Sequence, residues 1–149
     1  MKSRIKKFWT RLLAAILGIL GFASCEPVLM YGSPHANFKA LGTVKDEAGQ
    51  SIEGIRVAVR QTRRNKSDNR EWNTNDTLYT DVKGAWTLIN YEGTVPDELT
   101  IVFEDIDGEA HGGAFKPAEV KPQIKQTHKG DNSWYLGAFE AEADVTLKK

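Results

Sequence analysis

The sequence predicts an all-β domain, a small antiparallel β-sandwich of about seven strands, and three observations carry this prediction. Apolar and polar residues alternate with a period of two in several short runs, as they do in strands with one buried face. No run after residue 37 sustains the 3.6-residue period of a helix. Turn-forming residues separate the runs at short intervals. A chain of 149 residues with 40% hydrophobic positions suits one globular domain.

The first predicted strand is 38–45, in which Phe38, Ala40 and Val44 share one face, and residues 46–49 form the turn that ends it. The same alternation predicts further strands at 55–60, 77–82, 85–90, 99–104, 134–139 and 143–147. A broken edge strand is expected within 115–123, because this segment contains two prolines.

Polar segments between the runs are predicted to be loops, and they are 63–76, 105–114 and 125–133. A turn at Lys83-Gly84 is expected to pair 77–82 with 85–90 as a hairpin. The inward positions of the strands predict a core made of Val44, Ile55, Val57, Trp86, Leu88, Ile101, Phe103 and Val145.

The charges of the chain are segregated, although the formal net charge is zero. Residues 1–25 contain five basic side chains and no acid, so residues 26–149 hold 15 basic and 20 acidic ones. A mildly acidic body of this kind argues against nucleic acid as a partner. The single cysteine, Cys25, excludes an internal disulfide and any zinc site built from several cysteines.

The amino-terminal segment has the pattern of an export signal. Basic residues within 2–11 precede an uncharged apolar run at 12–22, which is too short to span a bilayer. The run is followed by Ala23, Ser24 and Cys25, and the whole segment resembles a bacterial lipoprotein signal. The alternative from the residues alone is a short buried helix that ends in a cysteine.

That resemblance implies cleavage before Cys25 and acylation of its thiol, so that the membrane is a partner through the lipid. The expected organisation is a signal peptide at 1–24, a lipid-anchored tether at 25–37 and a β-sandwich at 38–149. The expected location is the bacterial cell envelope, on the periplasmic side or at the outer-membrane surface.

Two segments together resemble the carboxypeptidase-regulatory-like repeat, which is a transthyretin-type β-sandwich. The first runs from Gly42 to Val57 as GTVKDEAGQSIEGIRV, and the second from Thr80 to Leu88 as TDVKGAWTL. Ser51 stands where the family usually has proline. The resemblance implies tight turns at Gly49 and Gly84 and places Trp86 in the core.

Nearly the whole chain resembles a Bacteroidetes family of lipoproteins associated with a radical S-adenosylmethionine enzyme. The residues that carry this resemblance are Met30-Tyr31-Gly32-Ser33-Pro34, 103–108 with Gly112-Gly113, and Trp134-Tyr135-Leu136-Gly137. The resemblance implies that such an enzyme is a partner of the chain or modifies it.

The acidic loop 105–113 offers the one metal site that the sequence suggests. Asp105, Asp107 and Glu109 stand at alternate positions beside glycines, so their oxygens could converge on calcium. The alternative is a solvated turn in which aspartate caps backbone amides. No other cofactor is expected, and His35, His111 and His128 fall in different predicted loops without zinc-ligand spacing.

Basic residues gather between positions 56 and 70, and the candidate binding residues among them are Arg56, Arg60, Arg63 and Arg64. They could form a docking patch for an acidic partner or for lipid headgroups. The alternative is a charged outer face that discourages edge-to-edge pairing of strands.

No catalytic apparatus emerges from the sequence, because it lacks a G-x-S-x-G elbow and a phosphate-binding glycine loop. We therefore expect a non-enzymatic, lipid-anchored envelope domain that serves as a binding or structural module. The alternative is a substrate or partner of the radical enzyme, and a third hypothesis is a small envelope hydrolase. The ligand and the oligomeric state are left open by the sequence.

Overall fold

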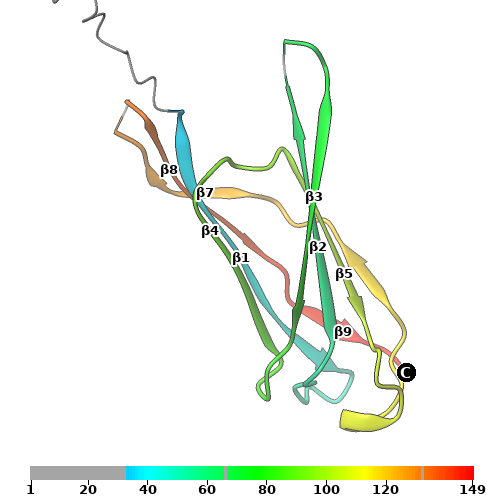
Figure 1. Ribbon diagram of the computed structural model, residues 1–149. Coiled ribbons are helices and arrows are strands. Elements are labelled where there is room, and N and C mark those ends of the chain that lie inside the picture. The colour runs from blue at the N-terminus through cyan, green and yellow to red at the C-terminus, as the bar shows by residue number, and fades with distance from the viewer. Residues whose placement is uncertain (1–32, 66, 132) are drawn as a thin grey trace, which may run out of the picture. The chain divides into compact units, whose positions relative to one another are not determined.

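Nine strands form two sheets in the part of the chain described by the computed structural model, residues 33–65, 67–131 and 133–149. The first sheet has the order β4-β1-β8-β7, and β9 also pairs with β1. The second sheet has the order β3-β2-β5-β6. The strands are β1 His35–Asp46, β2 Arg56–Arg64, β3 Glu71–Tyr79, β4 Ala85–Gly93, β5 Glu98–Glu104, β6 Ala118–Val120, β7 Lys125–Lys129, β8 Tyr135–Glu142 and β9 Val145–Leu147 (Figure 1).

The two-sheet, all-β architecture predicted from the sequence is confirmed, but only the second sheet is purely antiparallel. Strand β1 pairs antiparallel with β4 and parallel with both β8 and β9. It begins at His35, so residues 35–37 of the predicted tether belong to a strand. The described residues contain nine strands rather than about seven.

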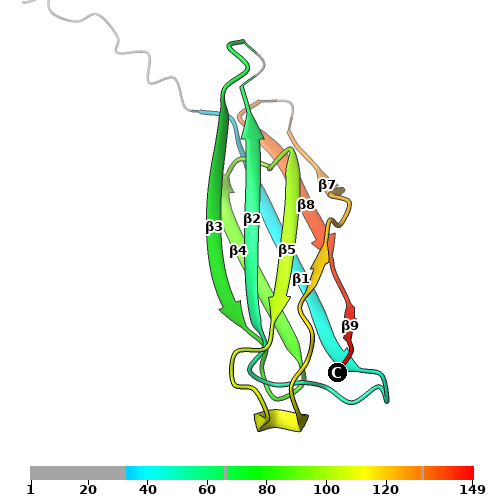
Figure 2. The ribbon, with the colours of Figure 1, turned by 90° about the vertical axis from the view of Figure 1, so that its right-hand side faces the viewer.

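The hairpin predicted between 77–82 and 85–90 is wrong. Strand β3 pairs with β2 in the second sheet, whereas β4 pairs with β1 in the first. The turn between β3 and β4 therefore carries the chain from one sheet to the other, as Figure 2 shows. Sequence alternation marks a strand but not its partner, because pairing is decided by how the two sheets close over the core.

The core lies between the two sheets and agrees with the predicted positions. Six of the predicted residues are buried: Val44, Ile55, Val57, Trp86, Ile101 and Phe103. The other two, Leu88 and Val145, are partly buried and pack against the same cluster. The rings of Trp86 and Phe103 meet edge to face with centroids 5.9 Å apart, and they come from different sheets.

Two predicted loops contain strands, and both departures have the same cause. Most of 63–76 belongs to the β2–β3 hairpin, and 125–129 of the predicted loop 125–133 is β7. The hairpin extends past the ends of its neighbours (Figure 1), and every residue of β7 is exposed. Strands without a buried face need no apolar alternation. Backbone pairing holds them, with polar cross-strand contacts such as Thr62 with Asn73 at 2.8 Å.

The turns implied by the carboxypeptidase-like motif are present. Oδ1 of Asp81 accepts hydrogen bonds from the amides of Lys83 and Ala85, and Oδ1 of Asp46 does the same for the amides of Ala48 and Gln50. Gly84 has a φ of 68°, and a Cβ there would collide with the carbonyl oxygen of Val44. Glycine is thus required where this turn approaches the end of β1.

Replacement of Trp86 by alanine should lower the free energy of unfolding by about 3–5 kcal/mol, because it removes a buried indole at the contact between the sheets. Chemical denaturation of the purified domain measures the change. The matched control is Trp134→Ala, since Trp134 is 45% exposed and its loss should cost less than about 1 kcal/mol. Equal costs for the two variants would contradict the assignment of Trp86 to the core.

Candidate functional site

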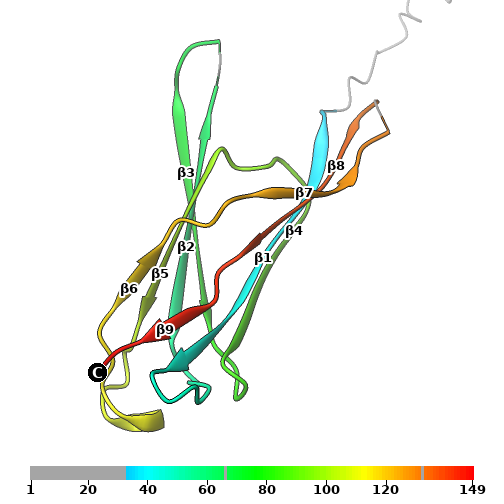
Figure 3. The same ribbon diagram turned by 180° about the vertical axis from the view of Figure 1, so that it is seen from behind.

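A pocket of about 600 Å³ opens between the two sheets, where the connection from β6 to β7 passes from the second sheet to the first (Figure 3). The β4–β5 connection, the start of β5, the β6–β7 connection and β8 form its walls. The lining residues are Val95, Pro96, Asp97, Glu98, Leu99, Lys121, Pro122, Gln123, Ile124 and Phe139. Six of these ten side chains are apolar, and they lie beside four polar or charged ones in an opening that is accessible to solvent.

The charged residues of this pocket are paired with one another and with β2. Nζ of Lys121 donates to Oε1 of Glu98 at 2.9 Å, and Nη2 of Arg64 lies 3.8 Å from Oε2 of the same carboxylate. The Lys121 hydrogen bond lowers the pKa of Glu98, and the same contact raises the pKa of Lys121. Asp97 accepts a hydrogen bond of 2.7 Å from the amide of Arg64. The pocket therefore combines apolar walls with a rim whose charges are balanced.

Sequence reasoning did not find this pocket. Its residues come from three separate segments, and neither proline-containing connection carries a motif. Only the alternation that places Leu99 inward was visible in the sequence, and it indicates a core position. The pocket opens where the chain leaves one sheet for the other, so its formation depends on the tertiary structure.

In the acidic loop proposed for calcium, the carboxylates of Asp105 and Asp107 have partners within the protein. Oxygens of Asp105 accept hydrogen bonds from the amides of Asp107, Gly108 and Phe115 at 2.9–3.2 Å. This is the capping arrangement that the sequence left open as the alternative. In the residues that the structure describes, no group of three or more His, Cys, Asp or Glu side chains could hold a metal ion. Calcium binding by Asp105, Asp107 and Glu109 is therefore not supported by their geometry.

The same loop brings together a histidine and a carboxylate. Nδ1 of His111 lies 2.6 Å from Oδ2 of Asp107, next to the 3-10 turn η1, Ala110–Gly112. The hydrogen bond and the charge of Asp107 raise the pKa of His111. Both side chains are substantially exposed and lie over Gly54, where a Cβ would be 3.2 Å from the Asp107 carboxylate. The four-residue spacing of Asp107 and His111 is the sequence signal of this pair, which the expectation of isolated surface histidines missed.

The four candidate arginines do not form one patch. Arg56, Arg60 and Arg64 have the same parity on β2 and share its outer face, whereas Arg63 lies on the opposite face. Arg56 is paired with Glu104, and Nε of Arg64 lies 2.6 Å from Glu71. Strand β2 is an interior strand and β3 is the edge, so these arginines do not shield an edge of β2. A binding role for them stays a prediction, and Cys25 lies outside the described residues.

No protein-family model and no curated protein matches the chain. Among solved structures, it is similar to wild-type catechol 1,2-dioxygenase from Acinetobacter radioresistens, with a TM-score of 0.51 and 14% identity over 83% of this chain and 60% of that one. It is also similar to the dioxygenase domain of a dioxygenase–carbohydrate-binding fusion from a cellulolytic Streptomyces. There the TM-score is 0.50 and the identity 12%, over 80% and 84% of the two chains. At such identity the likeness shows the fold alone.

These neighbours correct the expectations of a non-enzymatic module and of a protein without a cofactor. Both are named as dioxygenases, which are enzymes, and neighbours of this kind are iron-dependent, so neither expectation follows from this fold. The expectation of a non-enzymatic protein rested on missing motifs. That inference fails because residues that act together are assembled by the fold and leave no contiguous motif.

The described residues nevertheless do not fit an iron site. His35, His111 and His128 lie on β1, η1 and β7, and none belongs to a metal-binding group of His, Cys, Asp and Glu side chains within the described ranges. His35 packs beside the ring of Tyr135, with centroids 5.6 Å apart and the two rings tilted by 41°. None of the described helices is long and apolar enough to span a membrane.

The imidazole of His111 should titrate above its ordinary pKa of about 6.5, and Asp107→Asn should return the pKa toward that value. Because the folded-state pKa is raised, the stabilisation is present below the unfolded-state pKa and is lost as the pH rises through the folded-state pKa. An NMR titration of the His111 ring measures this pKa in the unmodified domain and in Asp107→Asn. Glu109→Gln is the control and should leave the titration unchanged, and equal effects of the two substitutions would contradict the pairing.

Proposed function

We propose that the pocket between the sheets, lined by Val95, Leu99, Ile124 and Phe139, takes a small aromatic molecule as its ligand or substrate. The observation that carries the proposal is the combination of a volume of about 600 Å³ with apolar walls and a charged rim. Pockets for small molecules have this size and this distribution of polar groups. An aromatic ring has two apolar faces and a planar shape, which suit an opening between two sheets.

We assign the ring of the ligand to Phe139 and its polar groups to the charged residues of the rim. The Phe139 side chain supplies an aromatic surface on which a second ring can pack in an offset or edge-to-face arrangement. At the rim, Lys121 donates hydrogen bonds and the carboxylates of Asp97 and Glu98 accept them. An aromatic ring with two adjacent hydroxyls can pack on Phe139 and also hydrogen-bond to the rim, since each hydroxyl both donates and accepts. The name of the structurally similar Acinetobacter enzyme, catechol 1,2-dioxygenase, supports catechol as the first probe.

Replacement of Val95 by tryptophan should fill the pocket and abolish catechol binding, because Val95 is half-buried in the pocket wall. Binding is measured by chemical-shift changes of the Leu99 and Ile124 amides during titration with catechol. The control is Val82→Trp, which adds the same indole at a residue that is 70% exposed in the β3–β4 turn. Saturable shifts that persist in Val95→Trp, or an absence of saturable shifts in the unmodified domain, would overturn the proposal.

We further propose that the chain is a lipoprotein of a bacterial cell envelope, with Cys25 as the acylated residue and new amino terminus. The basic segment, the apolar run and the following cysteine support this location. Several acyl chains at about 0.8 kcal/mol per buried CH₂ give durable anchoring. A transthyretin-type arrangement of the repeat-like segments, and association with a radical S-adenosylmethionine enzyme, belong to the same proposal and rest on the resemblances in the sequence.

Cys25→Ala should leave an uncleaved precursor or release the protein from the membrane fraction, because the thiol that carries the lipid is missing. Fractionation combined with intact-mass measurement of the protein checks both outcomes. Ser33→Ala is the control, since it changes an exposed residue outside the signal and should leave a lipidated mass. Membrane retention of a processed Cys25→Ala protein would contradict the anchor.

A further inference from the structure

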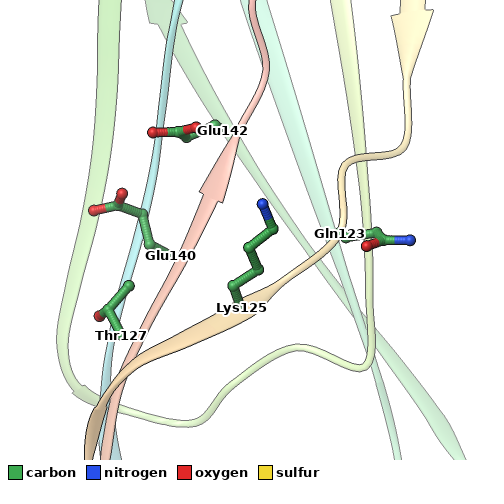
Figure 4. A pocket seen from close by; sticks show the side chains of 5 residues that line it. All are labelled: Gln123, Lys125, Thr127, Glu140 and Glu142. Carbon is green, nitrogen blue, oxygen red and sulfur yellow. The ribbon is translucent and has the colours of Figure 1, made fainter.

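A second hollow lies on the face of the first sheet opposite the core. It has a volume of about 370 Å³ and is lined by Gln123, Lys125, Thr127, Glu140 and Glu142. Ala141 is 1% exposed and packs in the core, so Glu140 and Glu142 on either side of it point to the other face of β8. Figure 4 shows both carboxylates on the β8 side and the ammonium of Lys125 extending into the hollow from β7.

Strand register places one row of side chains across this sheet. Lys39 on β1 pairs with Ile89 on β4 and with Glu140 on β8, and Glu140 pairs with Lys125 on β7. Side chains at paired positions share a face and lie about 4.5–5.5 Å apart at Cβ. The row therefore runs from an apolar residue through a lysine and a glutamate to a second lysine, and Glu142 stands two residues further along β8.

The charges in this row are balanced but incompletely paired. Nζ of Lys39 lies 3.9 Å from Oε2 of Glu140, which is a long contact between half-exposed groups. Among the ion pairs between described residues, none includes Lys125 or Glu142. The hollow thus offers one ammonium and one carboxylate whose charges are available to a ligand, held on adjacent strands.

An apolar recess continues from the hollow toward β4. A space of about 210 Å³ shares Thr127 and Glu140 with the hollow and is also lined by Ile89, Ala138 and the Lys39 side chain. Ile89 is 47% exposed, which is unusual for a large apolar side chain on a sheet face. A ligand that fills both spaces needs charged groups of both signs at one end and an apolar group at the other.

We propose that this surface binds a free amino acid with an apolar side chain. Its ammonium group is held by Glu142, its carboxylate is held by Lys125, and its side chain covers Ile89 in the recess. Charge-assisted hydrogen bonds supply recognition of the head group, and burial of the side chain adds apolar contact. This surface borders the aromatic pocket between the sheets, since Gln123 lines both the pocket and the hollow and Phe139 lines both the pocket and the recess. The two sites differ in their other residues, because Val95 and Leu99 line only the pocket, and Lys125 and Glu142 line only the hollow.

Titration of the domain with L-leucine should give saturable shifts of the Thr127 and Glu140 amides. Removal of either head-group charge from the ligand should weaken binding about tenfold, which corresponds to about 1.4 kcal/mol. Leucinol lacks the carboxylate, 4-methylpentanoate lacks the ammonium, and glycine lacks the apolar side chain. Each of the three should therefore bind more weakly than leucine to the unmodified domain.

Two variants test whether Lys125 contacts the carboxylate of the ligand and Glu142 contacts its ammonium group. In Lys125→Met, leucine and leucinol should bind equally, because the group that distinguishes them has lost its partner. In Glu142→Gln, leucine and 4-methylpentanoate should bind equally for the corresponding reason. Lys129→Met is the matched control, since it removes an exposed lysine from the same strand outside the hollow and should leave the preference for leucine intact.

The proposal is overturned if leucine gives no saturable shift, if Lys129→Met loses affinity as Lys125→Met does, or if neither variant changes the order of the ligands. Val95→Trp should leave leucine binding unchanged. Loss of catechol binding in Val95→Trp, with leucine binding retained, would therefore report on the pocket and not on this surface. Thermal unfolding of each variant checks that the exposed substitutions leave the fold intact.

Discussion

The burial of two sheet faces against each other is the constraint on which the rest of this structure depends. Trp86 from β4 and Phe103 from β5 meet edge to face across the core, and Val44, Ile55 and Val57 pack around them. Once these side chains are buried, their alternating neighbours must point to solvent. The outer face of the first sheet, with Lys39, Glu140 and Lys125 in one row, is therefore a consequence of the same alternation.

The connections that carry the chain between the sheets determine where the pocket between them lies. The β4–β5 and β6–β7 connections both leave one sheet for the other, and their apolar residues line the opening instead of filling it. Glu98, Lys121 and Arg64 balance their charges at this rim. The molecule thus presents an apolar pocket between its sheets and a charged hollow on a sheet face, which suit ligands of different chemistry.

The likeness to catechol dioxygenases concerns the arrangement of strands, and the side chains in the described residues carry a different chemistry. His35 packs at a tilt against Tyr135, and His111 is held by Asp107 in a loop at the surface. Neither histidine joins a group that could bind a metal within the ranges described. One fold supports many functions because its strands tolerate different residues at their ends and in the connections between them.

The sequence by itself determined the elements whose side chains contact the core. Alternation placed Val57, Trp86 and Phe103 inward, and local turn chemistry at Asp81 and Gly84 ended a strand, because both depend on residues that are close in the chain. Only the tertiary structure decided that β3 and β4 belong to different sheets and that the polar segments 71–76 and 125–129 are strands. Polar strands are held by backbone pairing with distant partners. The pockets also join side chains from separate segments, so neither leaves a local pattern in the sequence.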